Sequence, residues 1–84
     1  MHKIDLRSID LNLLLVFEAL MQQRSVSKAA AHLHRTQSAI SHALERLRQQ
    51  LGDPLLVRQG MDMVPSPFAL HLYEQLHPLL RQLA

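Results

Sequence analysis

The chain has 84 residues, of which 48% are hydrophobic, and it contains no cysteine. This length supports one small domain, near the size at which a single core is marginally stable and association often helps. The lack of cysteine excludes a disulfide framework and thiol chemistry, and it suits a reducing cytoplasm. The polar start and the short apolar runs predict neither a secretory leader nor a membrane span. We therefore expect a cytoplasmic domain with no membrane contact.

The positive charge of the chain is concentrated in its middle. The formal net charge is +2, but residues 24–58 hold six Lys and Arg against two acidic residues, a local net charge of +4. A basic face is the usual electrostatic sign of a nucleic-acid binder. A solvated surface with a chance imbalance would give the same count, so charge alone does not decide between them.

The first predicted helix begins after Asp10, a good N-cap residue, and ends near Arg24. Leu14, Phe17 and Met21 share one face of it, and the neighbouring positions are also largely apolar. Such broad apolarity predicts a helix that is buried on more than one side, as the central support of a small bundle would be.

A second, shorter helix is predicted to start at Val26 or Ser27, with Ser25 as its cap. Val26, Ala29, Ala30 and Leu33 fall at helical spacing and form one apolar stripe. The small alanines allow another helix to cross closely.

A polar turn at residues 34–36 leads to a third predicted helix, from about Gln37 to Leu51. Thr36 is its expected cap, Gly52 supplies a left-handed end, and Pro54 prevents the helix from resuming. Its apolar positions are Ile40, Leu44, Leu47 and Leu51, and its first turns expose Gln37, Ser38, Ser41 and His42. This is the layout of a helix-turn-helix, whose second helix is presented to the major groove of DNA.

After the third helix the pattern changes to that of a small β-hairpin, or wing. Leu55–Arg58 is short and partly β-branched, residues 59–62 suggest a turn, and Met63–Pro65 can return as a second strand. Arg58 is placed to reach a phosphate or the minor groove. The alternative is a structural ion pair between Arg58 and Asp62 across the hairpin.

The last predicted helix opens at Ser66-Pro67, with the serine as cap and the proline at the first helical position. Its apolar residues recur at spacings of three and four: Ala69, Leu72, Leu76, Leu79 and Leu83, flanked by Tyr73 and Leu80. We expect this heptad pattern to be buried against the same helix of a second copy, because a compact domain leaves no partner for it. We also expect the sequence to be the first part of a longer protein.

Two other functional classes explain less of the sequence. A protein-interaction module would account for the leucines of the last helix but not for the polar face of residues 37–42 or the local charge. An enzyme is disfavoured because the histidine pairs His32/His34 and His71/His77 do not share helix faces, and because the chain has only two glycines for a phosphate loop. We expect no catalytic residue, no metal site and no cofactor.

Taken together, these features resemble the N-terminal DNA-binding region of LysR-type bacterial transcriptional regulators, over about Asp10 to Leu83. The residues that carry the resemblance are Leu14, Phe17, Ser25-Val26-Ser27, Ala29-Ala30, Leu33, Gln37, Ile40-Ser41, Leu44, Leu47, Leu51-Gly52-Asp53-Pro54-Leu55, Arg58 and Val64-Pro65-Ser66-Pro67. Two segments, Ser41–Leu44 and Pro65–Pro67, are most similar to the branch with nodulation and LeuO-like regulators. The chain departs from the family at Ser38, where many members have proline, at Leu56, where many have phenylalanine, and at His42, where a longer polar side chain is common.

The resemblance implies a mainly α fold: a winged helix-turn-helix over residues 1–65, then a linker helix over 66–84 that dimerises. It also implies a larger effector-sensing domain outside this sequence. Family members contact DNA through the positions of Gln37, Ser38, Ser41, His42 and Arg58.

The position of each residue suggests which part of double-stranded DNA it contacts. Gln37, Ser41 and His42 should read base edges, because the N-terminal turns of the recognition helix lead groove insertion. The flanking residues Ser25, Ser27, Lys28, Arg35 and Thr36 should mainly hold phosphates, and Ser38, Arg46 and Arg58 complete the candidate set. A homodimer would meet the half-sites of an inverted-repeat operator, with a tetramer as the alternative assembly of the full-length protein.

Overall fold

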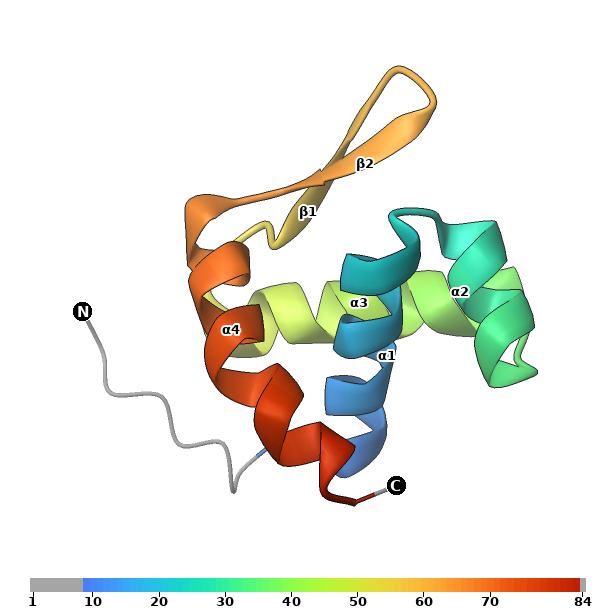
Figure 1. The fold of residues 1–84 in the computed structure, drawn as a ribbon. Coiled ribbons are helices and arrows are strands. Elements are labelled where there is room, and N and C mark those ends of the chain that lie inside the picture. The colour runs from blue at the N-terminus through green and yellow to red at the C-terminus, as the bar shows by residue number, and fades with distance from the viewer. Residues whose placement is uncertain (1–8, 84) are drawn as a thin grey trace.

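The computed structural model describes residues 9–83; the polar start of the chain and Ala84 lie outside the described residues. In this range the chain forms four helices and a two-stranded antiparallel sheet (Figure 1). The elements are α1 (Leu11–Gln23), α2 (Val26–Leu33), α3 (Gln37–Leu51), β1 (Leu56–Gln59), β2 (Asp62–Pro65) and α4 (Pro67–Arg81). The predicted fold class, a mainly α winged helix-turn-helix, is confirmed.

Each helix begins at the predicted cap. The Asp10 carboxylate accepts a hydrogen bond from the backbone N–H of Asn12 at 2.7 Å, and Ser25 accepts one from Lys28 N–H at 3.2 Å. Thr36 accepts from the backbone N–H of Ala39 at 3.0 Å. Because the first N–H groups of a helix have no partner within it, these side chains determine where each helix starts.

The core forms around α1, which packs against α2, α3 and α4. Phe17 and Leu20 of α1 are fully buried, as are Ile40 and Leu47 of α3. Ala29 on α2 is also fully buried, which agrees with the predicted close crossing of helices. The prediction that α1 is the central support is therefore confirmed.

The wing is a short antiparallel hairpin that projects from the helices in Figure 1. Gln59 pairs with Asp62 across a two-residue turn, and Gly60 at the first central position has φ 61°, as a type II′ turn requires. Strand β1 begins at Leu56, one residue later than predicted, because Leu55 adopts a left-handed conformation with φ 64°. Strand β2 begins one residue earlier than predicted, at Asp62.

The structure corrects the prediction for α4. Four of its apolar residues are buried in the core of the same chain, where α4 packs against α1: Ala69, Leu72, Leu76 and Leu80. The expectation that these four residues are buried against a second copy is wrong, because α1 is apolar on more than one side and offers α4 a face. Leu79 and Leu83 remain exposed, at 56% and 66%, and Tyr73 is half-buried.

Polar side chains fix the edge of the contact between α1 and α4. Gln22 donates from Nε2 to the Tyr73 hydroxyl at 3.2 Å, and the Tyr73 ring stacks on His77 with centroids 5.0 Å apart. His77 Nδ1 lies 2.8 Å from the Glu18 carboxylate. These contacts hold α4 antiparallel to α1 in one register.

Candidate nucleic-acid interface

The turn between α2 and α3 is short and closed by its own backbone. His34 adopts a left-handed conformation, with φ 57°, and its N–H donates to the carbonyl of Ala31 at 3.3 Å. The N–H of Arg35 donates to the carbonyl of Ala30 at 2.9 Å. The last carbonyls of α2 are thus satisfied without lengthening the turn, and α3 starts immediately afterwards at the Thr36 cap.

The first turns of α3 present a polar, exposed face. Gln37, Ser38, Ser41 and His42 are all exposed, whereas Ile40 in the same turns is fully buried. Across residues 9–83, the four polar side chains make no hydrogen bonds with the protein, so their donors and acceptors are available to a ligand. The structure brings together the residues that were predicted to read base edges.

The predicted phosphate-holding residues are partly engaged in capping. Ser25 Oγ accepts from the Lys28 backbone and lies 3.0 Å from Ser27 Oγ, and Thr36 Oγ1 accepts from the Ala39 backbone. A hydroxyl that accepts at a cap can still donate its hydrogen outward. Arg35 is exposed and donates from Nη2 to the Asn12 side chain at 3.3 Å. Lys28 is also exposed.

Arg58 lies on the wing, on β1, and is exposed. It pairs in the strand register with Met63, and Asp62 pairs with Gln59. The alternative ion pair between Arg58 and Asp62 is absent from the part of the chain that the structure describes. The Met63 N–H donates to the carbonyl of Arg24 at 3.3 Å, which docks β2 on the junction of α1 and α2.

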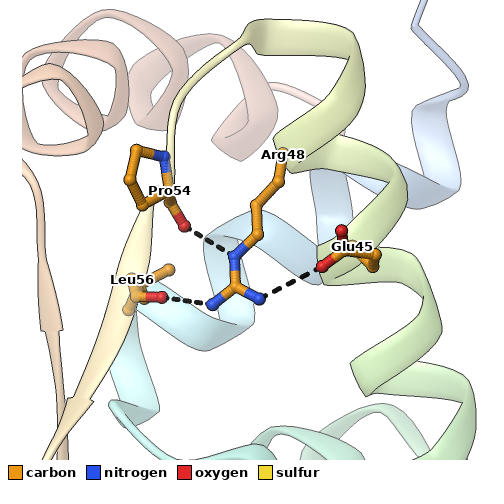
Figure 2. Close-up of polar contacts among 4 residues, drawn as sticks. All are labelled: Glu45, Arg48, Pro54 and Leu56. Atoms are coloured by element: carbon orange, nitrogen blue, oxygen red, sulfur yellow. Dashed lines mark hydrogen bonds and ion pairs between the residues drawn. The ribbon is translucent and has the colours of Figure 1, made fainter.

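Arg48 has a role that the sequence analysis missed. Its guanidinium donates to the carbonyls of Pro54 and Leu56 and lies 3.3 Å from the Glu45 carboxylate (Figure 2). In the sequence analysis Arg48 contributed only to the local positive charge of residues 24–58. The available signal was its position one helical turn before Gly52, where a short loop brings the chain back beside the end of α3.

Asp53 joins the two ends of the wing. Its Oδ2 atom accepts from the Leu55 N–H at 2.8 Å and from the Ser66 hydroxyl at 2.6 Å. Ser66 Oγ in turn accepts from the Ala69 N–H at 3.0 Å and so caps α4, as predicted. The wing is therefore connected to both α3 and α4.

Comparison with known proteins places this arrangement in a family. The model of the bacterial regulatory helix-turn-helix proteins, lysR family, matches residues 11–70, from the start of α1 to the first turn of α4. The chain belongs to the lysR family. The predicted resemblance to LysR-type regulators is confirmed, while the nodulation and LeuO-like branch stays a prediction.

Relatives of this lysR-family chain are regulators of transcription. It is 54% identical over 71 residues to the activator NagR of a Ralstonia species, covering 84% of this chain and 24% of NagR. It is 48% identical over 80 residues to the regulator SyrM of Rhizobium etli, covering 95% of this chain and 24% of SyrM. The chain thus spans about a quarter of the length of the curated relatives it matches.

Solved structures of the lysR family have the same fold. A crystal structure of a "probable transcriptional regulator" from Pseudomonas aeruginosa matches with a TM-score of 0.89 and 52% identity, over 93% of this chain and 26% of that one. The BenM DNA-binding domain, in complex with benA site 1 DNA, matches with a TM-score of 0.82 and 28% identity, over 89% of this chain and 84% of that one.

The described part of this lysR-family chain has neither a metal-binding cluster nor a membrane-spanning helix. Residues 9–83 contain no cluster of three or more His, Asp or Glu able to hold a metal ion. No helix in the described range is long and apolar enough to cross a membrane.

Proposed function

We propose that this chain binds double-stranded DNA sequence-specifically, as the DNA-binding part of a cytoplasmic LysR-type transcriptional regulator. α3 enters the major groove, and the wing places Arg58 at the flanking backbone or minor groove. The role is binding rather than catalysis. In this proposal residues 1–65 bind DNA and residues 66–84 form the linker helix.

The observation that carries the proposal is the polar face at the start of α3. Four polar side chains are exposed together on the leading turns of α3: the Gln37 amide, the Ser38 and Ser41 hydroxyls and the His42 imidazole. Side chains of this kind can hydrogen-bond base edges. Lys28, Arg46 and Arg58 are also exposed and would supply the charge that attracts phosphates.

The BenM DNA-binding domain, which shares the fold, was crystallised with DNA, and this supports the same partner here. NagR and SyrM are regulators of transcription, which supports the biological role. An effector domain is expected in the remainder of a full-length protein, since the curated relatives are about four times longer.

We further propose that two copies associate through α4 on the surface that holds Leu79 and Leu83. Leu79 on α4 and Leu83 just after the helix are exposed, at 56% and 66%, whereas Ala69, Leu72, Leu76 and Leu80 are buried. A dimer would present two copies of α3 to the half-sites of an inverted repeat.

The test is a titration of the chain with random duplexes and with duplexes enriched by the chain from a random pool, each at two salt concentrations. We expect tighter binding to the enriched duplexes and a steep loss of affinity at higher salt, because bound phosphates release counterions. A module that binds only proteins would bind neither duplex. That outcome would refute the proposed function.

A further inference from the structure

Arg48 connects the third helix to the first strand of the wing. Nε donates to the Pro54 carbonyl at 2.8 Å, and Nη2 donates to the Leu56 carbonyl at 2.6 Å. Nη1 lies 3.3 Å from Oε2 of Glu45, one turn earlier on α3 (Figure 2). Because a guanidinium is planar and its donors are rigidly spaced, these three contacts fix the β1 end of the loop relative to α3.

The orientation of Arg48 removes it from the set of cations that can face a ligand. Its side chain is 32% exposed, and contacts from three different nitrogens point toward the protein. Arg46, two residues earlier on the same helix, is exposed instead. The two arginines therefore carry the same charge but differ in what they touch.

The bond to Leu56 is the direct hydrogen-bonded link from α3 to a strand of the wing within residues 9–83. The second strand is held elsewhere, by Met63 N–H on the Arg24 carbonyl. Arg58 follows Leu56 by two residues on β1. The backbone that carries Arg58 thus continues directly from the carbonyl that Arg48 holds.

We propose that Arg48 is a positioning residue for DNA binding: it holds β1 so that Arg58 reaches the backbone while α3 occupies the groove. The proposal rests on the proposed DNA-binding function of α3 and the wing. Arg48 itself makes no contact with DNA.

A double-mutant cycle separates positioning from direct contact. Binding of Arg48→Met, Arg58→Ala and the double variant to a random-sequence duplex is measured over a range of salt concentrations. We expect Arg58→Ala to weaken binding about tenfold and to lower the salt slope by about one. Arg48→Met should lower the slope by a similar amount, and the double variant should match Arg58→Ala to within about twofold.

The matched control is Arg46→Met, which removes the same charge from the same helix. Its effect should multiply with that of Arg58→Ala, since the two side chains share no partner in the described residues. Multiplicative effects in the Arg48 cycle would instead mean that Arg48 contacts DNA directly, and would overturn the proposal. Unchanged binding by Arg48→Met would overturn it as well.

A second readout needs no DNA. In the free protein, Arg48→Met should speed amide hydrogen exchange of Val57 and Gln59, the β1 residues at hydrogen-bonded positions of the hairpin, relative to the amides of α1. Glu45→Gln keeps the bonds from Arg48 to the carbonyls and should not have this effect. Equally faster amide exchange in α1 and the wing would overturn the proposal, because Arg48 would then stabilise the domain as a whole. Loss of the whole fold in both Arg48→Met and Arg48→Lys would overturn it for the same reason. If the unchanged protein binds no duplex, the proposed function fails, and this exchange experiment still tests the positioning.

Discussion

At the scale of single residues, the exposed side chains on α3 and the wing differ in what they offer to DNA. The Gln37 amide holds a donor pair and an acceptor, a combination that can pair with both hydrogen-bonding groups of an adenine edge. Arg58 offers charge and several donors, which suit a phosphate of any sequence. Gln37 should therefore contribute mostly to the choice of DNA sequence, and Arg58 mostly to affinity.

Gln37→Ala tests base reading. We expect it to cost about 1–3 kcal/mol on an enriched duplex and little on random DNA, because only the enriched site offers the matching base edge. Fluorescence anisotropy with both duplexes measures the difference. Gln50→Ala, at the exposed far end of the same helix, is the control and should change neither affinity. An equal loss on both duplexes would show that Gln37 binds the backbone.

Arg58→Ala tests the role of the wing. We expect weaker binding to enriched and random duplexes alike and a salt slope lowered by about one per chain, since one phosphate contact is lost. Arg81→Ala, an exposed arginine at the end of α4, serves as the charge-matched control. Unchanged binding together with a lower melting temperature would show that Arg58 is structural.

At the scale of elements, short hydrogen bonds define both ends of the wing. Ser66 caps α4 through the Ala69 N–H and donates its hydroxyl hydrogen to Asp53, and its own N–H donates to the Leu55 carbonyl at 2.8 Å. One residue thus joins the start of α4 to the loop before β1. We therefore expect a substitution of Ser66 to affect the hairpin and α4 together.

Ser66→Ala tests this connection. We expect it to lower the free energy of unfolding by about 1–2 kcal/mol, because the cap of α4 and the bond to Asp53 are lost together. Urea denaturation measures the change. Ser38→Ala, at an exposed serine that makes no hydrogen bond with residues 9–83, should stay within about 0.5 kcal/mol. An equal effect of the two changes would contradict the assigned role of Ser66.

At the scale of the whole molecule, α4 has two different apolar surfaces. Leu76 is 3% exposed and belongs to the core formed with α1, whereas Leu79 is 56% exposed. The inner surface stabilises a single chain, and the outer one is available for a second copy. Stability and association are therefore separable properties of this helix.

Leu76→Ala and Leu79→Ala test the separation. We expect Leu76→Ala to cost about 2–5 kcal/mol of unfolding free energy, because it leaves a cavity in the core. Leu79→Ala should leave the stability of the monomer within about 0.5 kcal/mol and weaken self-association. Denaturation at low protein concentration and sedimentation equilibrium measure the two quantities. Unchanged association of the Leu79 variant would place the dimer contact on another surface.

Local signals in the sequence determined the helix starts, the span of α3 and the polar face of its first turns. A cap such as Thr36 acts on an N–H three residues away, and a left-handed end such as Gly52 acts within one turn, so neither depends on the rest of the chain. The candidate reading residues followed for the same reason, because helical periodicity assigns Ile40, Leu44 and Leu47 to the buried side of α3 and leaves the polar residues of its first turns exposed.

Only the tertiary structure decided what covers α4 and what Arg48 holds. A heptad of leucines is satisfied equally well by a second copy or by another helix of the same chain, and the choice depended on the face that α1 leaves open. The partners of Arg48 are backbone carbonyls of Pro54 and Leu56, and every residue carries such a carbonyl. No pattern of side chains could name them, because the return of the chain beside α3, rather than the identity of those residues, brings them within reach.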